Sequence, residues 1–144
     1  MKKRAKRRKS RNRKHKGKRQ TFKATRCEEI LFAGFGGQGI MFMGKLLAQA
    51  ALSEGKHVTW MPSYGAEVRG GTAHSMTKVS DDYIASPVVS APSTCVVMNY
   101  PSLLKYEERV KANGLLISNR SLMNRMPKRR DIGILNIAMT DIAT

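Results

Sequence analysis

Two glycine-rich loops, each directly after a short strand-like run, constrain the fold of this chain more than any other feature. The first loop, GFGGQG at residues 34–39, follows the apolar residues 30–33, and the second, residues 62–72, follows residues 57–61. Seven of the twelve glycines lie in these two loops. Because ordering glycine costs conformational entropy, such clusters indicate backbone that turns sharply or is closely approached. If both runs are strands of a parallel sheet, both loops lie at its carboxyl edge.

The rest of the chain after residue 26 alternates between strand and helix patterns. Residues 40–53 repeat apolar side chains at helical spacing, and Gly55 follows as a cap at the carboxyl end of that helix. Short apolar runs predict further strands at residues 29–33, 94–98, 115–118 and 132–137. This alternation predicts an α/β fold with a Rossmann-like, mostly parallel sheet and flanking helices.

Three other segments give more specific expectations. Residues 73–79 alternate between two kinds of side chain, which predicts a two-faced strand and an antiparallel edge of the sheet. Pro101 is expected to open a helix that runs to about residue 112, because proline is tolerated in a first helical turn. Thr140-Asp141 is expected to cap a last helix.

The first loop also satisfies the G-x-G-x-x-G pattern of dinucleotide-binding proteins, through Gly34, Gly36 and Gly39. A helix amino terminus after such a loop attracts phosphate, so an NAD- or FAD-dependent oxidoreductase is one candidate class. Such a site normally adds an Asp or Glu about twenty residues on, which binds the ribose hydroxyls. The second strand ends in Thr59-Trp60-Met61-Pro62 without an acid, which favours tight packing without a nucleotide.

The positive charge of the chain is concentrated at its start. Residues 1–26 hold 15 of the 27 Lys and Arg residues and no acid, so the remainder has 12 basic and 10 acidic side chains. Like charges and a single aromatic residue, Phe22, predict a disordered tail. Three interpretations stay open: an extension without a dedicated role, an arm that binds nucleic acid non-specifically, and an arm that docks on an acidic protein.

Other residue types limit the possible chemistry. Cys27 and Cys95 lack the spacing of a metal or iron–sulfur site, and Cys95 lies in an apolar run that predicts a core position. We expect a cytoplasmic protein, since two lone cysteines fit a reducing compartment and no apolar run is long enough to span a membrane. No catalytic or metal-binding set is expected within this chain.

Three segments together resemble the gamma subunit, or gamma domain, of the 2-oxoacid:ferredoxin oxidoreductases. They are residues 28–52, which contain GFGGQG, residues 55–82, which contain PSYGAEVRGGTA, and residues 95–119. The motif PSYGAEVRGGTA is most similar to the 2-oxoglutarate (KorC-like) branch of the family. The pyruvate, branched-chain oxoacid and indolepyruvate branches are also similar. The resemblance covers essentially everything after the basic tail.

This resemblance implies a function that the chain performs only with partners. Members of the family oxidatively decarboxylate a 2-oxoacid on thiamine diphosphate, pass electrons through iron–sulfur clusters to ferredoxin, and release an acyl-coenzyme A. The thiamine diphosphate and the clusters are held by other subunits, one thiamine-diphosphate-binding and one ferredoxin-like. The gamma domain is implied to be a Rossmann-like scaffold near the entrance for substrate and coenzyme A, with no cofactor bound by this chain alone.

The expected site for coenzyme A or for a neighbouring subunit comprises the two loops. Its residues are Gly36, Gly37, Gln38, Gly39, Tyr64, Arg69, Gly70, Gly71 and Thr72. Arg69 is expected to pair either with a phosphate or carboxylate or with Glu67 or a neighbouring subunit, since guanidinium makes bidentate contacts. Gln38 is expected to hydrogen-bond the backbone at the helix start.

Two features depart from the family pattern. The tail of residues 1–26 has no counterpart in it, and the chain stops at Thr144 where the family domain continues for a few tens of residues. We therefore expect a gamma-type domain at residues 27–144 that is truncated at its carboxyl terminus.

Overall fold

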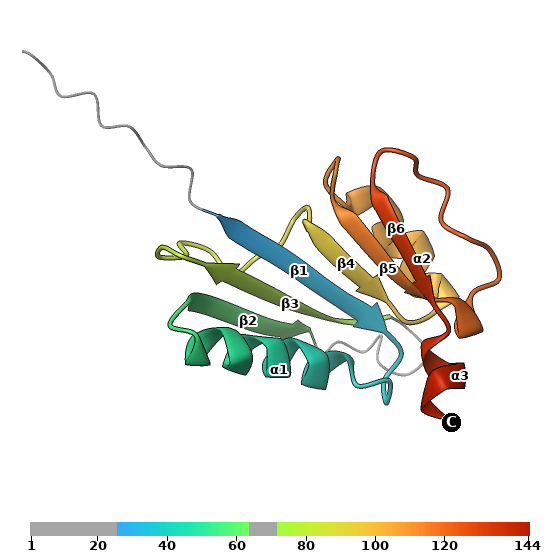
Figure 1. The fold of residues 1–144 in the computed structure, drawn as a ribbon, viewed down its shortest axis with the longest axis horizontal. Coiled ribbons are helices and arrows are strands. Elements are labelled where there is room, and N and C mark those ends of the chain that lie inside the picture. Colours follow the sequence, from blue (N-terminus) through green and yellow to red (C-terminus); the bar gives the residue numbers. More distant parts are fainter. Residues whose placement is uncertain (1–25, 64–71) are drawn as a thin grey trace, which may run out of the picture.

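The computed structural model describes residues 26–63 and 72–144, which form a six-stranded mixed sheet flanked by helices (Figure 1). The strands are β1 (Cys27–Gly34), β2 (His57–Ser63), β3 (Ala73–Ser80), β4 (Thr94–Val97), β5 (Leu115–Asn119) and β6 (Gly133–Ile137). The helices are α1 (Ile40–Ser53), α2 (Tyr100–Tyr106) and α3 (Met139–Ala143), with short 3-10 turns η2 (Glu107–Arg109) and η3 (Arg120–Leu122). The predicted α/β fold class is confirmed.

The strand order is β2-β3-β1-β4-β5-β6. The strands β1, β4, β5 and β6 pair in parallel, whereas β3 is antiparallel to both of its neighbours, β1 and β2. The predicted strand and the predicted antiparallel edge are both confirmed, because the edge pair of β2 and β3 is antiparallel. The edge strand is β2, and β3 lies between β2 and β1.

The side chains of β3 include hydroxyl groups that are buried within the fold. Its small polar residues Ser75 and Thr77 are fully buried beneath α1. The Trp60 Nε1–H donates to Ser75 Oγ at 2.8 Å, and Thr77 Oγ1 donates to the Gly44 carbonyl at 3.2 Å. Hydroxyls that would suggest a solvated face therefore satisfy partners inside the fold.

Close packing of α1 on the sheet depends on Gly44. A Cβ at this position would clash with Ser75 Oγ and lie 2.8 Å from Trp60 Nε1. The helix ends with Gly55 at a φ of +74°, while the Gly55 and Lys56 amides bond to the Leu52 and Ala51 carbonyls at 3.0 and 3.1 Å. This is the Schellman arrangement, which confirms the predicted helix and its glycine cap.

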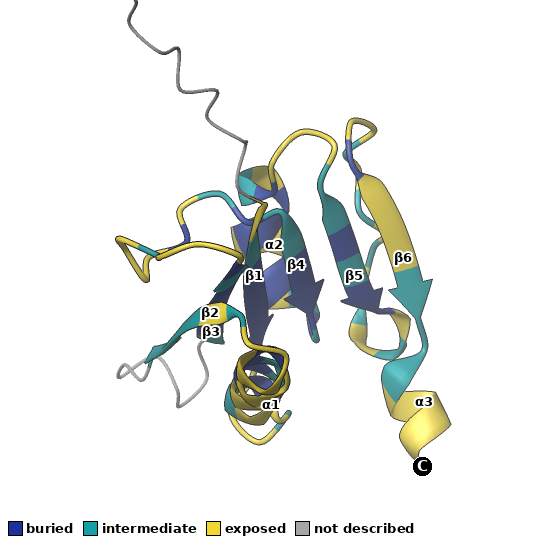
Figure 2. Cartoon of the chain, turned by 60° about the vertical axis from the view of Figure 1, so that its left-hand side comes forward, coloured by how far each residue is buried: buried dark blue, intermediate teal, exposed yellow. Residues whose placement is uncertain are grey.

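The two faces of the sheet carry separate apolar clusters. Figure 2 shows that buried residues are concentrated in the central strands β1 and β4. The cluster on the α2 side centres on Leu31, Val97, Leu103 and Leu116, and the cluster on the α1 side on Ile30, Phe32, Ile40 and Val96. Cys95 lies fully buried in the first cluster, as predicted, and burial raises the pKa of its thiol to about 12. The thiol is therefore an apolar core group.

The helix after Pro101 is shorter than predicted, because α2 ends at Tyr106 and not near residue 112. Glu107, which begins η2, is buried and binds a distant loop. Its carboxylate accepts hydrogen bonds from the Lys128 and Arg129 amides and, at 2.9 Å, from Arg125 Nη2. These long-range bonds fix the backbone after Tyr106 in a tighter turn, which local sequence could not reveal.

Candidate functional site

The carboxyl ends of β1 and β2 lie at the same edge of the sheet, on either side of the start of β3 (Figure 1). His74 is paired with Ala33 on one side and with Ser63 on the other. The end of β1, the end of β2 and the start of β3 thus lie at one edge, as the sequence predicted for the two strands that precede the loops. Thr72, just before β3, is buried.

Part of the expected site lies outside the described residues. This part comprises residues 64–71, including Tyr64, Arg69, Gly70 and Gly71. The predicted contacts of Arg69 with a ligand or with Glu67 therefore remain predictions.

The glycines of the first loop meet two different requirements. Gly37 and Gly39 have φ values of +89° and +73°, a backbone region that side chains disfavour. Gly34 is required for space, because a Cβ there would lie 2.6 Å from Gln38 Oε1 and 2.7 Å from Ile40 Cδ1. The loop can therefore turn from β1 directly into α1, whose amino-terminal cap is Gly39.

Gln38 holds the loop in this shape. Its Oε1 accepts hydrogen bonds from the Phe35 amide at 2.7 Å and from Asn99 Nδ2 at 3.1 Å. The prediction that Gln38 hydrogen-bonds the backbone is confirmed, but its partner is the Phe35 amide just after β1 and not an amide at the helix start. The bond to Asn99 adds a link to the turn after the next parallel strand.

Two buried asparagines at strand ends were not predicted as site residues. Asn99, after β4, accepts from the Ser102 amide at 2.9 Å and so caps α2. Asn119, at the end of β5, accepts from the Met139 amide at 2.9 Å, and its Nδ2 donates to Thr140 Oγ1 at 2.9 Å and to the Met98 carbonyl at 3.3 Å. For both asparagines, the sequence shows a polar amide directly after an apolar run that predicts a strand. This pattern was the signal that could have identified them.

The start of α3 differs from the predicted capping by Thr140-Asp141. The helix begins after Ala138, and Thr140 and Asp141 lie within its first turn. The Asn119 side chain, from a neighbouring strand, accepts the first helical amides. The helix is therefore capped by Asn119, which is distant in the sequence, and not by Thr140-Asp141.

A cleft of about 410 Å³ opens beside the glycine loop. It is lined by Phe35, Gly36, Gly37, Gly39, Ile40, Met41, Phe42 and Ala73. The lining is mainly backbone and apolar side chains, and Phe42 is 67% exposed. Such a surface fits contact with another chain, because large exposed aromatic side chains are enriched at interfaces.

The strand order does not favour the dinucleotide alternative. In the doubly wound dinucleotide fold the second strand lies beside the first, so that its terminal acid reaches the ribose. Here β3 separates β2 from β1. The end of β2 is therefore two strand spacings, about 10 Å, from β1. It also holds no carboxylate at residues 57–63.

Within the described residues, no group of three or more His, Cys, Asp or Glu side chains is arranged to hold a metal ion. In the same part of the chain, no helix is long and apolar enough to cross a membrane. The features that the structure shows at the carboxyl edge are its backbone turns, its amide side chains and its apolar cleft.

Comparison with known proteins gives a consistent result. A family model described as pyruvate ferredoxin/flavodoxin oxidoreductase matches residues 29–144. The chain is 37% identical over 114 residues to the ketoisovalerate oxidoreductase subunit VorA of Methanothermobacter marburgensis, covering 79% of this chain and 24% of VorA. It is 35% identical over 120 residues to the 2-oxoglutarate synthase subunit KorC of Methanocaldococcus jannaschii, covering 81% of this chain and 64% of KorC.

Among solved structures, the chain is similar to the gamma subunit of a keto/oxoacid ferredoxin oxidoreductase from Geobacter sulfurreducens. The TM-score is 0.68 at 27% identity, covering 81% of this chain and 64% of that subunit. The chain therefore spans only part of the relatives that it matches.

Proposed function

This chain belongs to the pyruvate ferredoxin/flavodoxin oxidoreductase family, and we propose that it acts as the gamma-type component of a 2-oxoacid:ferredoxin oxidoreductase. The observation that carries the proposal is the pairing of GFGGQG with PSYGAEVRGGTA inside a family match over residues 29–144. The similarity to a gamma subunit structure supports the same assignment.

The chain acts within an assembly and not alone. A thiamine-diphosphate-binding subunit and a ferredoxin-like subunit with iron–sulfur clusters supply the redox chemistry, coenzyme A accepts the acyl group, and ferredoxin accepts the electrons. The match to VorA supports this division, because the segment similar to this chain is only 24% of that longer polypeptide.

We favour 2-oxoglutarate as the oxoacid. The sequence of the second glycine-rich loop and the similarity to KorC support this choice of substrate. Ketoisovalerate is the alternative that the VorA match supports, and pyruvate is a third candidate.

The carboxyl edge of the sheet serves as the contact with a neighbouring subunit near the coenzyme A entrance. The positive-φ turn at Gly37 and Gly39 and the apolar cleft lined in part by the exposed Phe42 support this role. Arg69, Gly70 and Gly71, outside the described residues, complete the site in this proposal. Arg69→Ala is expected to leave the fold intact while weakening assembly or the apparent affinity for coenzyme A, and Gly71→Val is expected to damage assembly more severely.

Reconstitution with the partner subunits tests the function. The assembly with this chain should reduce methyl viologen in the presence of coenzyme A and one oxoacid, with 2-oxoglutarate giving the highest kcat/KM among 2-oxoglutarate, ketoisovalerate and pyruvate. The isolated chain should give no reduction. Oxoacid-dependent reduction by the isolated chain, or an assembly whose activity is unchanged when this chain is left out, would refute the proposal.

A further inference from the structure

The segment from α2 to the start of β6 carries most of the positive charge that follows the amino-terminal tail. Residues 100–130 hold eight Lys and Arg side chains and two acids, whereas residues 27–99 hold four Lys and Arg side chains and six acids. One of the two acids, Glu107, is 2% exposed, so it adds almost no negative charge to the surface. The surface of this segment is therefore strongly positive.

Hydrogen bonds hold the loop between β5 and β6 beside η2. Arg125 Nη2 donates to Glu107 Oε2 at 2.9 Å, and Arg129 Nη1 donates to the Glu107 carbonyl at 3.2 Å. The Lys128 amide donates to the Glu107 carboxylate, while the Lys128 side chain is exposed. The cations of the loop and those of α2 and η2 therefore lie close together.

Two tyrosine rings help to fix these cations. Arg125 Cζ lies 6.0 Å from the ring centre of Tyr100. Lys105 Nζ and Arg109 Cζ lie 5.5 and 5.3 Å from the ring centre of Tyr106. Arg109 Nη2 also donates to a main-chain carbonyl of the loop before β4 at 3.2 Å. Because these contacts already restrict the side chains, a partner that binds them causes a smaller loss of conformational entropy.

Exposed apolar side chains lie among the cations. Leu104 is 53% exposed and follows Tyr100 by one helical turn, and Met126 is 46% exposed. Arg125 Nη1 donates to the Met126 carbonyl at 2.9 Å, which places this residue beside the cation over Tyr100. Arg and Met side chains are enriched in protein–protein interfaces, in which polar groups surround an apolar centre. We refer to the following six residues as the cationic face: Leu104, Lys105, Arg109, Arg125, Met126 and Lys128.

We propose that the cationic face docks an acidic protein. Carboxylates of the partner pair with the Lys and Arg side chains, and an apolar centre of the partner covers Leu104 and Met126. Complementary charge of this kind increases the rate of association and fixes the register of two folded surfaces. Guanidinium groups held in place suit carboxylates that are themselves fixed on a folded protein. The inference does not rest on the proposed function.

A nucleic acid fits the cationic face less well. Single strands gain affinity when their bases stack on exposed aromatic rings. Here Tyr106 is fully buried, and Arg125 lies over Tyr100. Leu104 and Met126 would face phosphates, which offer no apolar contact. The combination of cations and aliphatic side chains therefore favours a protein partner.

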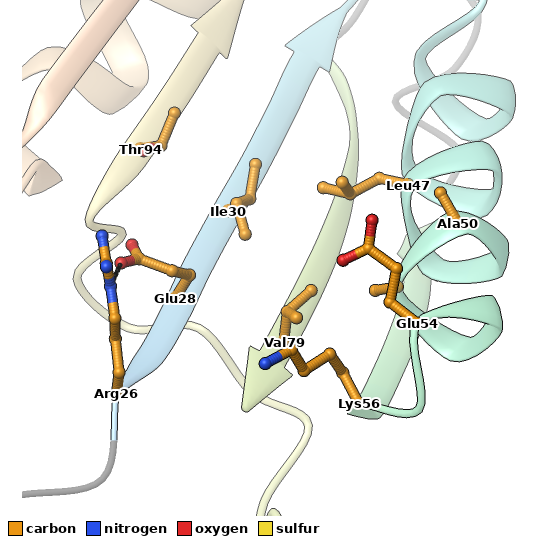
Figure 3. Close-up of a pocket in the computed structure, with 10 residues that line it drawn as sticks. Arg26, Glu28, Ile30, Leu47, Ala50, Glu54, Lys56, Val79 and Thr94 are labelled. Atoms are coloured by element: carbon orange, nitrogen blue, oxygen red, sulfur yellow. Dashed lines mark hydrogen bonds and ion pairs between the residues drawn. The ribbon is translucent and has the colours of Figure 1, made fainter. Parts of the chain in front are cut away.

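A second copy of the chain is a poor match in charge. Each copy has a formal net charge of +17, so two copies repel each other. Figure 3 shows Glu28 beside Arg26, whose Nε donates to Glu28 Oε1 at 3.1 Å. Glu29 pairs with Lys78 at 2.8 Å. These carboxylates are already neutralised within the chain, which favours a different, acidic partner.

Titration of the full, nitrogen-15-labelled chain with a synthetic acidic peptide tests the proposal by nuclear magnetic resonance. The peptide consists of Glu and Leu, with Leu at helical spacing, so that it combines carboxylates with an apolar stripe. Amide shifts should change at residues 104–109 and 125–128. The same peptide with Ser in place of Leu should bind about tenfold more weakly, because it cannot cover Leu104 and Met126.

A matched pair of charge reversals separates this face from the net charge. Lys128→Glu and Lys45→Glu both change an exposed lysine and lower the net charge equally, but Lys45 lies on α1. Lys128→Glu should raise the dissociation constant of the Glu-Leu peptide about fivefold, and Lys45→Glu less than about twofold. Residues 1–25 are the same in every variant, so any attraction they exert cancels in the ratio.

A second pair of variants tests the apolar centre. The double substitution Leu104→Gln and Met126→Gln should weaken binding of the Glu-Leu peptide about tenfold. Leu52→Gln is the control, because Leu52 is 58% exposed at the end of α1. It should leave the dissociation constant unchanged. Thermal midpoints close to that of the wild type would show that both proteins remain folded.

Two results would overturn the proposal: amide shifts that leave residues 104–109 and 125–128 unaffected, and equal effects of Lys128→Glu and Lys45→Glu. An RNA oligonucleotide that displaces the peptide from these residues more effectively at equal charge would assign the face to a nucleic acid instead. Dimers in sedimentation that Lys128→Glu dissociates would assign it to a second copy. None of these results depends on whether the chain joins oxidoreductase partners.

Discussion

Asn99 Nδ2 donates a 3.1 Å hydrogen bond to Gln38 Oε1 and so joins the turn after β4 to the glycine loop after β1. Asn99 is 2% exposed, and its Oδ1 also caps α2. The position of the glycine loop is thereby coupled to the next parallel strand and its helix, which makes the carboxyl edge one connected unit.

Gln38→Ala should destabilise the protein by about 2 kcal/mol, because the buried Asn99 donor and the Phe35 amide both lose their acceptor. Urea unfolding measures this difference. The control is Gln49→Ala on the exposed side of α1, which should change the free energy of unfolding by less than about 0.5 kcal/mol. Equal urea midpoints for Gln38→Ala and Gln49→Ala would show that the hydrogen bonds of Gln38 contribute nothing to stability.

Gly44→Ala should lower stability by about 3 kcal/mol, because the new methyl group meets Ser75 and Trp60 beneath α1. Gly37→Ala is the contrast: no atom lies within 4 Å of its Cβ position, so only the positive φ is strained, at about 1 kcal/mol. Thermal and urea unfolding should therefore show a larger loss of stability for Gly44→Ala than for Gly37→Ala. A larger effect at Gly37 would contradict the packing described for α1.

Asn119→Ala should release α3 and destabilise the fold by about 2 kcal/mol, since the partly buried Met98 carbonyl and the first amides of α3 lose their partner. Hydrogen exchange of the Met139 and Thr140 amides should accelerate. Asn124→Ala, on the exposed loop, is the matched control and should leave exchange at α3 unchanged. Unaltered exchange in the Asn119 variant would show that α3 is held by other contacts.

Glu107 should contribute to loss of stability in acid. Burial alone would raise its pKa, but the hydrogen bonds from the Lys128 amide, Arg125 and the Arg129 amide outweigh burial and hold the pKa below the ordinary 4.5. Because the folded pKa is the lower one, the stabilisation is complete above about pH 4.5 and is lost as the pH falls through the folded pKa.

Glu107→Gln should therefore lower stability at pH 7 by about 2 kcal/mol and flatten the dependence of the unfolding free energy on pH below 4.5. The exposed neighbour Glu108→Gln is the control and should keep the wild-type slope. The same acid slope for Glu107→Gln and wild type would show that other carboxylates account for it.

The sequence was sufficient where structure follows from local pattern. Helix α1, its Gly55 cap and the parallel strands were all predicted, because apolar periodicity and glycine placement determine them. A backbone hydrogen bond of Gln38 was also predicted, since its partner lies three residues away.

The predictions of helix ends were wrong where a residue distant in the sequence, and not the local pattern, determines the structure. The end of α2 depends on bonds from Glu107 to residues about twenty positions on, and the start of α3 depends on Asn119 from another strand. Such pairings follow from tertiary packing, which periodicity does not encode.

We propose that this chain is a gamma-type component of an assembly. This can be tested by native mass spectrometry of the chain co-expressed with a thiamine-diphosphate-binding subunit and a ferredoxin-like subunit. We predict one complex that contains all three polypeptides in fixed ratio and that loses this chain when Phe42, exposed on α1, is changed to Glu. A wild-type chain that stays apart from a complete complex of the other two would contradict the claim.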